Sequence, residues 1–192
     1  LVHFAYTRQK KPLGLGHAIQ ITRNLLNSEP FSVFLGDDII DSRTPVMKQM
    51  MRVFKNYRTT ILAVQKVPSS EAHLYGIIKA EKAGERVYKV TDLVEKPRSN
   101  PPSNLAIIGR YILTPGIFWA LERTTPGKGG EIQLTDALKM LLPTEDIYAY
   151  EFEGERFDAG DKLGFLKANV AFALKRKDML EELRRFLKKM RV

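Results

Sequence analysis

The sequence predicts an α/β protein with a parallel sheet and helices on its faces. Apolar residues recur at helical spacing in some segments, compact β-branched and aromatic runs fill others, and the two kinds alternate with short connections. Such alternation is typical of a parallel sheet flanked by helices. The 192 residues, 44% hydrophobic and 28% charged, suffice to bury one core, so we expect a single domain over residues 1–192.

The first part of the chain predicts strands and helices in turn. We expect strands at residues 1–6, 31–35 and 59–67, with helices at 15–26 and from Pro45 to Phe54. The run at 31–35 is compact and apolar, which favours a buried strand. Proline is favoured in the first turn of a helix, so Pro45 marks the start of the second one.

The second part adds a hairpin and more helices. Ala83 and Gly84 stand in a short turn between two strand-like runs, which predicts an antiparallel pair. The expected elements are strands at 76–81, 86–95 and 105–113, helices at 115–122 and 132–142, and a long C-terminal helix over about 161–190.

Composition narrows the classes of function. No apolar run approaches the roughly 20 residues that cross a bilayer, so we expect no membrane partner. The chain has no cysteine, which excludes disulfides and thiolate metal sites and fits a cytoplasmic protein. Eight basic and three acidic residues in 175–192 supply much of the net charge of +9. A solvated helix face explains this charge, and no basic stripe interleaved with aromatic residues indicates a nucleic-acid partner.

Carboxylates at strand ends are candidate metal ligands. Asp37 and Asp38 directly follow the apolar run at 31–35, where ligands gather in open α/β sheets. Asp158 lies far along the sequence, and with Asp37 it can clamp Mg²⁺, which prefers one or two carboxylates with water and phosphate oxygens. An Asx-turn or a helix cap equally explains the Asp37-Asp38 pair, and Asp161 suits a helix N-cap.

Two further segments combine residues suited to phosphates and sugars. Gly14 and Gly16 precede a helix, so the backbone there can approach a flat base or a phosphate. Glu95 and Lys96 end a predicted strand before a proline, where the carboxylate can accept from sugar hydroxyls and the ammonium can bind a phosphate. An ordinary turn and an exposed charge pair are the simpler interpretations of these segments.

Five motifs in this order resemble those of the sugar nucleotidyltransferase family, and in particular its glucose-1-phosphate uridylyltransferases. They span nearly the whole chain, and their agreement as a set is specific. The motifs are Gln9 with Pro12-Leu13-Gly14-Leu15-Gly16-His17-Ala18, Leu35-Gly36-Asp37-Asp38, Val94-Glu95-Lys96-Pro97, Gly130-Glu131-Ile132-Gln133-Leu134-Thr135-Asp136-Ala137-Leu138, and Phe157-Asp158-Ala159-Gly160-Asp161-Lys162-Leu163-Gly164.

The resemblance implies a Rossmann-like mixed sheet flanked by helices and a role for each matched residue. Gln9 and Gly14 would recognise the uracil edge, and Asp37 and Asp158 would bind the catalytic Mg²⁺. Glu95 would hold sugar hydroxyls and Lys96 the sugar phosphate. The hexose pocket would be lined by Tyr75, Gly76, Ile108 and Gly109.

The implied reaction joins UTP and glucose 1-phosphate into UDP-glucose and pyrophosphate, with in-line attack on the α-phosphorus and Asp37, Lys96 and Asp158 as catalytic groups. The resemblance also implies a homodimer or homotetramer, and we expect the C-terminal helix to pack against another subunit through Leu183, Phe186, Leu187 and Met190. Alternatives are a thymidylyltransferase or other sugar-phosphate nucleotidyltransferase, and a non-catalytic binding or assembly protein of the same fold.

The sequence departs from the family at its start. The family pattern begins with a Gly-x-Gly-Thr-Arg loop and a Pro-Lys ahead of the nucleobase motif, and residues 1–192 contain no such stretch. That loop supplies backbone amides and basic residues to the triphosphate. We therefore expect the chain to be the C-terminal two-thirds of the family fold and to be inactive as written.

Overall fold

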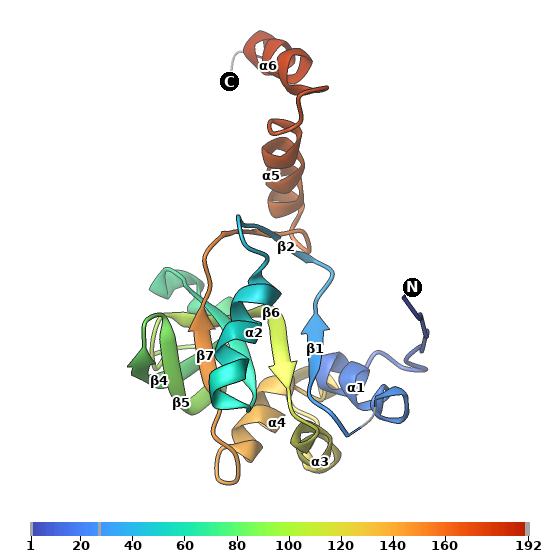
Figure 1. Cartoon of the computed structure of the whole chain (residues 1–192), viewed down its shortest axis with the longest axis vertical. Helices are drawn as coiled ribbons and strands as arrows, with labels where there is room; N and C mark the ends of the chain where they lie inside the picture. Colours follow the sequence, from blue (N-terminus) through green and yellow to red (C-terminus); the bar gives the residue numbers. More distant parts are fainter. Residues whose placement is uncertain (1, 27, 191–192) are drawn as a thin grey trace. The chain divides into compact units, whose positions relative to one another are not determined.

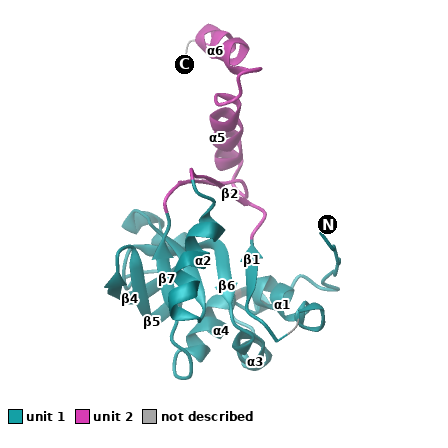
Figure 2. Ribbon diagram, viewed as in Figure 1, with its two compact units in different colours: residues 1–34, 44–152 teal, residues 35–43, 153–192 magenta. Residues whose placement is uncertain are grey.

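The computed structural model describes residues 2–26 and 28–190 of the chain (Figure 1). The chain divides into two compact units (Figure 2). Unit 1 comprises Leu1–Phe34 and Thr44–Phe152, and unit 2 comprises Leu35–Arg43 and Glu153–Val192. The single domain over residues 1–192 stays a prediction; each unit has a hydrogen-bonded sheet of its own.

Unit 1 is built on a six-stranded sheet with the order β1-β6-β3-β7-β5-β4. Its strands are β1 (Phe31–Phe34), β3 (Ile61–Lys66), β4 (Gly76–Gly84), β5 (Val87–Glu95), β6 (Leu105–Leu113) and β7 (Tyr148–Glu151). Among these strands only β3 and β7 are parallel neighbours. The expected parallel sheet is therefore wrong, and the mixed sheet implied by the resemblance is confirmed. The hairpin β4–β5 and the loop from β5 to β6 contain no crossover helix, which parallel neighbours require.

Helices cover this sheet. They are α1 (Gly14–Gln20), α2 (Val46–Tyr57), α3 (Gly116–Arg123) and α4 (Leu134–Leu141), with short 3-10 turns at Arg23–Leu25, Ser69–Leu74 and Lys128–Gly130. Helix α2 lies across the strands and contacts β3, β6 and β7 (Figure 1). Helix α4 packs on β5, and α1 and α3 pack against it.

The core of unit 1 lies around β6, which is buried at almost every position, and the first four residues of β3. Burying each aliphatic side chain contributes about 1.5–3 kcal/mol, so these strands dominate the hydrophobic stabilisation. The largest fully buried side chains are Met50, Ile61, Leu62, Ile77, Ile78, Leu93, Ile108, Leu113, Ile117, Leu121, Leu138 and Ile147.

Three expectations for the start of the chain are wrong in detail. Residues 2–6 are exposed and form no strand, because no neighbouring strand pairs with them. The expected helix 15–26 ends at Gln20, after which a 3-10 turn continues to Leu25. Strand β1 is not buried: it alternates, and the side chain of Phe34 is exposed beside the Arg110 guanidinium, 5.1 Å from the ring centroid.

Unit 2 contains a two-stranded antiparallel ladder and two helices. The elements are β2 (Asp38–Asp41), β8 (Glu155–Asp158), α5 (Lys162–Ala173) and α6 (Leu180–Lys189). Asp161 caps α5 by accepting from the Gly164 amide at 2.8 Å, which confirms its N-cap role. One continuous helix over 161–190 is wrong. After α5, the Lys175 and Arg176 amides donate to carbonyls three residues back, which tightens the helix and ends it.

Among the described helices none combines the length and the apolar character that a bilayer crossing requires.

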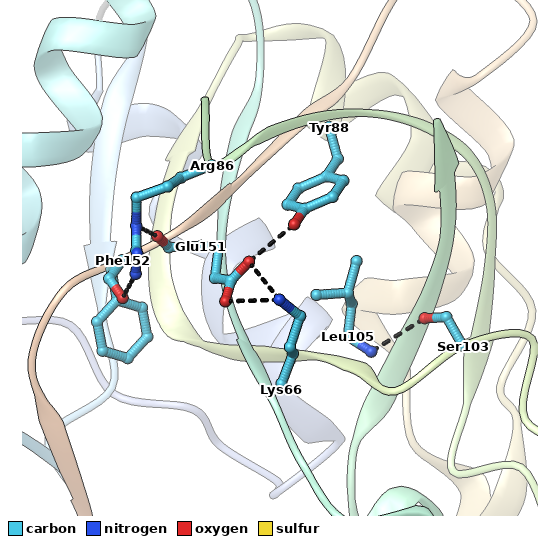
Figure 3. Close-up of polar contacts among 7 residues, drawn as sticks. All are labelled: Lys66, Arg86, Tyr88, Ser103, Leu105, Glu151 and Phe152. Atoms are coloured by element: carbon cyan, nitrogen blue, oxygen red, sulfur yellow. Dashed lines mark hydrogen bonds and ion pairs between the residues drawn. The ribbon is translucent and has the colours of Figure 1, made fainter. Parts of the chain in front are cut away.

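A polar cluster ties the end of β7 to its neighbours (Figure 3). Lys66 Nζ lies 3.1 Å from both carboxylate oxygens of Glu151, and the Tyr88 hydroxyl donates to Oε2 at 2.8 Å. Arg86 donates to the carbonyls of Glu151 at 2.6 Å and Phe152 at 2.9 Å. Partial burial opposes ionisation, but hydrogen bonds from Tyr88 and Lys66 outweigh it and lower the pKa of Glu151. The hydrogen bond that Tyr88 donates to Glu151 also raises the pKa of the Tyr88 hydroxyl.

Glu151→Gln should lower the free energy of unfolding by about 1 kcal/mol near pH 7, because charge-assisted hydrogen bonds are replaced and solvent screens the pair. Since the pKa of Glu151 is lower in the folded state, its contribution is present above the unfolded value of about 4.3 and is lost as pH falls through the folded value. Urea unfolding at neutral and acid pH measures this, with exposed Glu85→Gln as the control. A difference from wild type that is equal at both pH values would contradict the assignment.

Candidate functional site

The loop before α1 is fixed to the segment before α4. The Gly16 amide donates to the Ile132 carbonyl at 2.9 Å, and the Ile132 amide donates to the Leu13 carbonyl at 2.8 Å. Gly14 has φ +90°, and a Cβ there would lie 2.8 Å from Glu131 Cβ. Position 14 therefore requires glycine both for its backbone conformation and for this close approach.

Gln9 and Gly14, the predicted nucleobase residues, lie together in this loop. The Gln9 side-chain amide donates to the Gly14 carbonyl at 3.2 Å, and its Nε2 lies 2.8 Å from His17 Nδ1. His17 is therefore a partner of Gln9. A side-chain amide has both a donor and an acceptor, so it can pair with the polar edge of a pyrimidine.

A cavity of about 720 Å³ lies at the end of β5 and includes both predicted sugar-phosphate residues, Glu95 and Lys96. Its volume is within the range of small-molecule sites, about 300–1,000 Å³. The lining residues are Leu93, Val94, Glu95, Lys96, Pro97, Arg98, Gly129, Glu131, Gln133, Asp136 and Lys139.

The carboxylate of Glu95 is held by Thr135 and lies close to Gly76. The Thr135 hydroxyl, in α4, donates to Glu95 Oε2 at 2.6 Å. Gly76, at the start of β4, is so close that a Cβ there would lie 2.9 Å from Thr135 Oγ1 and 3.2 Å from Glu95 Oε2. Lys96 Nζ lies 3.8 Å from Glu95 Oε1, and the Lys96 amide donates to the Tyr75 carbonyl at 3.0 Å. The Glu95 carboxylate is thus oriented by Thr135, and the neighbouring Lys96 ammonium is half exposed.

The cavity wall carries charges of both signs. Lys139 pairs with Asp92 at 2.7 Å, and the hydrogen bond from Lys139 lowers the pKa of that carboxyl. Lys96 and Arg98 add cationic groups to the wall, and Glu131 adds an acidic one. This mixture suits a ligand that has both hydroxyls and a phosphate.

The structure brings Tyr75, Gly76, Glu95 and Lys96 together, but of these four residues Tyr75 and Gly76 do not line the cavity. Ile108 and Gly109 are buried within β6 and are not among the described residues that line the cavity. Their strand nevertheless reaches this region, because Ile107 Cδ1 lies 3.3 Å from the Cβ position of Gly76.

In unit 2, the register of β2 and β8 aligns the two predicted metal carboxylates. Asp38 pairs with Asp158, so Asp37 lies just before the ladder, and its carbonyl accepts from the Ala159 amide at 2.7 Å. A Cβ at Gly160 would lie 3.2 Å from Asp158 Oδ1 and 3.3 Å from Asp37 Oδ2. The two carboxylates therefore converge over Gly160.

This pair fits Mg²⁺, which takes one or two carboxylates and completes its shell with water and phosphate oxygens. Within the described residues, no group of three or more histidine or acidic side chains forms a fuller protein site.

Several residues of the two sites were missed from the sequence. Arg156 pairs with both Asp38 and Asp158, although it is 118 residues from Asp38. Thr135 stands inside the motif 130–138, and this is the signal that could have identified it. Lys139 follows four residues later, one helical turn along the same element, and no motif marks it.

The fold and the two sites define a nucleotide-transferring protein. A sequence model of nucleotidyl transferases matches residues 1–174, and the chain belongs to this family. The curated relatives identify the branch. The chain is 50% identical over 192 residues to UTP–glucose-1-phosphate uridylyltransferase of Staphylococcus haemolyticus and 47% identical to that of Staphylococcus epidermidis. These alignments cover 99% of this chain and 66% of each relative, so the chain spans about two thirds of their length.

Solved structures agree. UDP-glucose pyrophosphorylase complexed with UDP-glucose superposes with a TM-score of 0.87 at 46% identity, covering 90% of this chain and 67% of that one. The UTP-bound enzyme from Acinetobacter baumannii gives 0.84 at 32% identity, covering 94% and 64%. A Bacillus anthracis protein described as a putative glucose-1-phosphate thymidylyltransferase, at 24% identity and a TM-score of 0.72, shares the fold alone. The resemblance to the uridylyltransferases is confirmed.

Gly76→Ala should lower the free energy of unfolding by about 2 kcal/mol, because the added methyl would press on the buried Thr135 hydroxyl and on Glu95. Gly36→Ala is the matched control, since a Cβ there meets nothing within 4 Å. Urea denaturation measures both. If both variants lower the free energy of unfolding equally and only slightly, the neighbours of position 76 accommodate the added methyl without cost.

Proposed function

We propose that this chain carries the substrate and metal residues of a UTP–glucose-1-phosphate uridylyltransferase. The reaction is UTP plus glucose 1-phosphate giving UDP-glucose plus pyrophosphate. The observation that carries the proposal is the Glu95 carboxylate, held by the Thr135 hydroxyl beside Gly76 at the wall of a cavity of about 720 Å³. The 46% identity to a UDP-glucose pyrophosphorylase complexed with UDP-glucose supports this choice.

Glu95 and Lys96 divide the recognition of the sugar phosphate. An ionised carboxylate only accepts, so Glu95 would receive hydrogen bonds from adjacent sugar hydroxyls. Lys96 has a mobile ammonium that is half exposed next to it, and it would pair with the phosphate of glucose 1-phosphate. Gly76, having no side chain, leaves the carboxylate accessible to the ring.

The loop containing Gln9 and Gly14 would hold the uracil. Its backbone is fixed by the two hydrogen bonds that Leu13 and Gly16 form with Ile132, so the recognition groups are oriented before the nucleotide binds. Pre-orientation reduces the entropy lost on binding.

The transfer needs no protein nucleophile, because the attacking oxygen of glucose 1-phosphate is already an anion. That oxygen forms a bond to the α-phosphorus of UTP while the bond from this phosphorus to the bridging oxygen breaks, and pyrophosphate leaves with the electron pair. Lys96 would orient the attacking phosphate, and Asp37 and Asp158 would hold Mg²⁺. Bound Mg²⁺ supplies charge stabilisation to phosphate oxygens.

A thymidylyltransferase is the second candidate enzyme. The relatives at 46–50% identity are named for UTP or UDP-glucose, which favours uridylyl transfer. Pyrophosphate release by the complete protein with UTP and with dTTP separates the two, because strong preference for dTTP would contradict our proposal. Absence of any Mg²⁺-dependent release would favour a non-catalytic binding protein. The cytoplasmic location remains a prediction.

A homodimer or homotetramer also remains a proposal. Phe186, Leu187 and Met190 of the C-terminal segment are exposed, and burial in a partner subunit would remove them from water. Light scattering should therefore give a mass of at least twice 21.9 kDa. A monomeric mass at all concentrations would exclude this assembly.

Glu95→Gln should raise the Kd of the chain for UDP-glucose about tenfold or more, since hydrogen bonds to a charged acceptor contribute about 1.5–3 kcal/mol. Calorimetric titration measures the change. Thr91→Val is the control, because Thr91 also lies on β5 but its hydroxyl donates to the Lys79 carbonyl on the hairpin. Unchanged affinity in Glu95→Gln would remove Glu95 from the sugar site.

A further inference from the structure

Arg156 joins two carboxylates of unit 2 through the two ends of its guanidinium. Its Nε donates to Asp38 Oδ1, and its Nη2 donates to Asp158 Oδ2 at 3.0 Å. The side chains of Arg156 and Asp38 are only 10% and 7% exposed, whereas that of Asp158 is 41% exposed. A buried ion pair therefore lies behind a carboxylate that is open to solvent.

Both oxygens of Asp158 are fixed as a result. Oδ2 accepts from Arg156, and Oδ1 accepts from the Gly160 amide at 3.1 Å. Oδ1 is the oxygen on the side of Gly160 where the Asp37 carboxylate also converges. The rotation of the Asp158 carboxylate is thus set by Arg156, two positions earlier on the same strand, together with the Gly160 amide.

The positive charge of Arg156 does not by itself favour cation binding. A guanidinium next to a divalent cation repels it, so the charge by itself would weaken the metal site. The shape of the guanidinium, in contrast, favours cation binding because it can orient carboxylates. A planar guanidinium reaches two carboxylates at once with fixed geometry, whereas a lysine ammonium is a single point charge on a flexible stem.

We propose that Arg156 and Asp38 are positioning residues that orient the Asp158 carboxylate for the divalent cation. Asp38 anchors the guanidinium within the β2–β8 ladder, and Arg156 directs Asp158 Oδ1 towards the side that Asp37 shares. The inference rests on the proposed function, because it requires Asp37 and Asp158 to bind the metal. It assigns to the second aspartate of the Asp37-Asp38 pair a role distinct from ligation.

The same strand offers a matched control. Asp41, at the other end of β2, forms an ion pair with Lys175 of the segment after α5. Asp38→Asn and Asp41→Asn remove the same charge from the same strand, but only Asp38 contacts Arg156 at the metal carboxylates.

The experiment is a titration of the chain with Mn²⁺ followed by electron paramagnetic resonance, with urea unfolding of each variant to confirm that it is folded. Arg156→Lys and Asp38→Asn should each raise the Kd for Mn²⁺ about 10–100-fold, the usual effect of removing partners that orient metal ligands. Asp41→Asn should stay within about twofold of wild type. Because Arg156→Lys keeps the charge, its effect reports orientation and not electrostatics.

The outcomes separate the inference from the proposed function. If wild type binds Mn²⁺ and Asp37→Asn loses it, an unchanged Kd in Arg156→Lys overturns the positioning role alone. Equal effects of Asp38→Asn and Asp41→Asn overturn it as well, since charge would then suffice. If wild type does not bind Mn²⁺, or Asp37→Asn still binds it, the metal site of the proposed function fails, and the inference fails with it. If Arg156→Lys does not fold, the comparison between the Mn²⁺ Kd of Asp38→Asn and that of Asp41→Asn decides whether the positioning role holds.

Discussion

Strand β6 pairs with β3 along most of its length, with β1 at residues 110–113 and with β4 at Ile77↔Ala106, and it is buried on both faces. A strand with no solvent-facing side accepts almost only apolar residues, so it also fixes how neighbouring strands approach it. The start of β4 packs closely against its neighbours, since a Cβ at position 76 would lie 2.9 Å from Thr135 Oγ1 and 3.3 Å from Ile107 Cδ1, and this favours glycine. Gly76 lies opposite Glu95 in the hairpin register, so this close packing adjoins the carboxylate that lines the cavity.

The short segment before and within α4 supports two recognition features at once. The Ile132 backbone holds the loop that contains Gly14, and Thr135 holds the Glu95 carboxylate. The proposed uracil loop and sugar carboxylate are therefore attached to one rigid element. Sites built on helices and strands keep their geometry better than sites built on loops alone.

In unit 2 the determining feature is strand register. The pairing of Asp38 with Asp158 places Asp37 and Gly160 beside the end of the ladder and puts Arg156 on the face where it reaches Asp38. A slip of one residue would turn every side chain of the strand to the other face and would separate the carboxylates. The tight backbone around Gly164, where a Cβ would lie 2.0 Å from the Asp158 carbonyl oxygen, further restricts how α5 follows β8.

The sequence by itself determined the elements whose patterns are local. Helical spacing identified α2, α3 and α4, and Asp161 marked the start of α5. The β4–β5 hairpin was predicted correctly, but the turn expected at Ala83 and Gly84 is wrong: both residues lie in β4, and the turn is at Glu85 and Arg86. Motif order indicated the family and the candidate site residues. Only the tertiary structure decided the antiparallel pairing around β6, the exposed face of β1, the break between α5 and α6, and the contacts of Arg156 and Thr135. These depend on which distant segments meet, and residue spacing along the chain does not encode that directly.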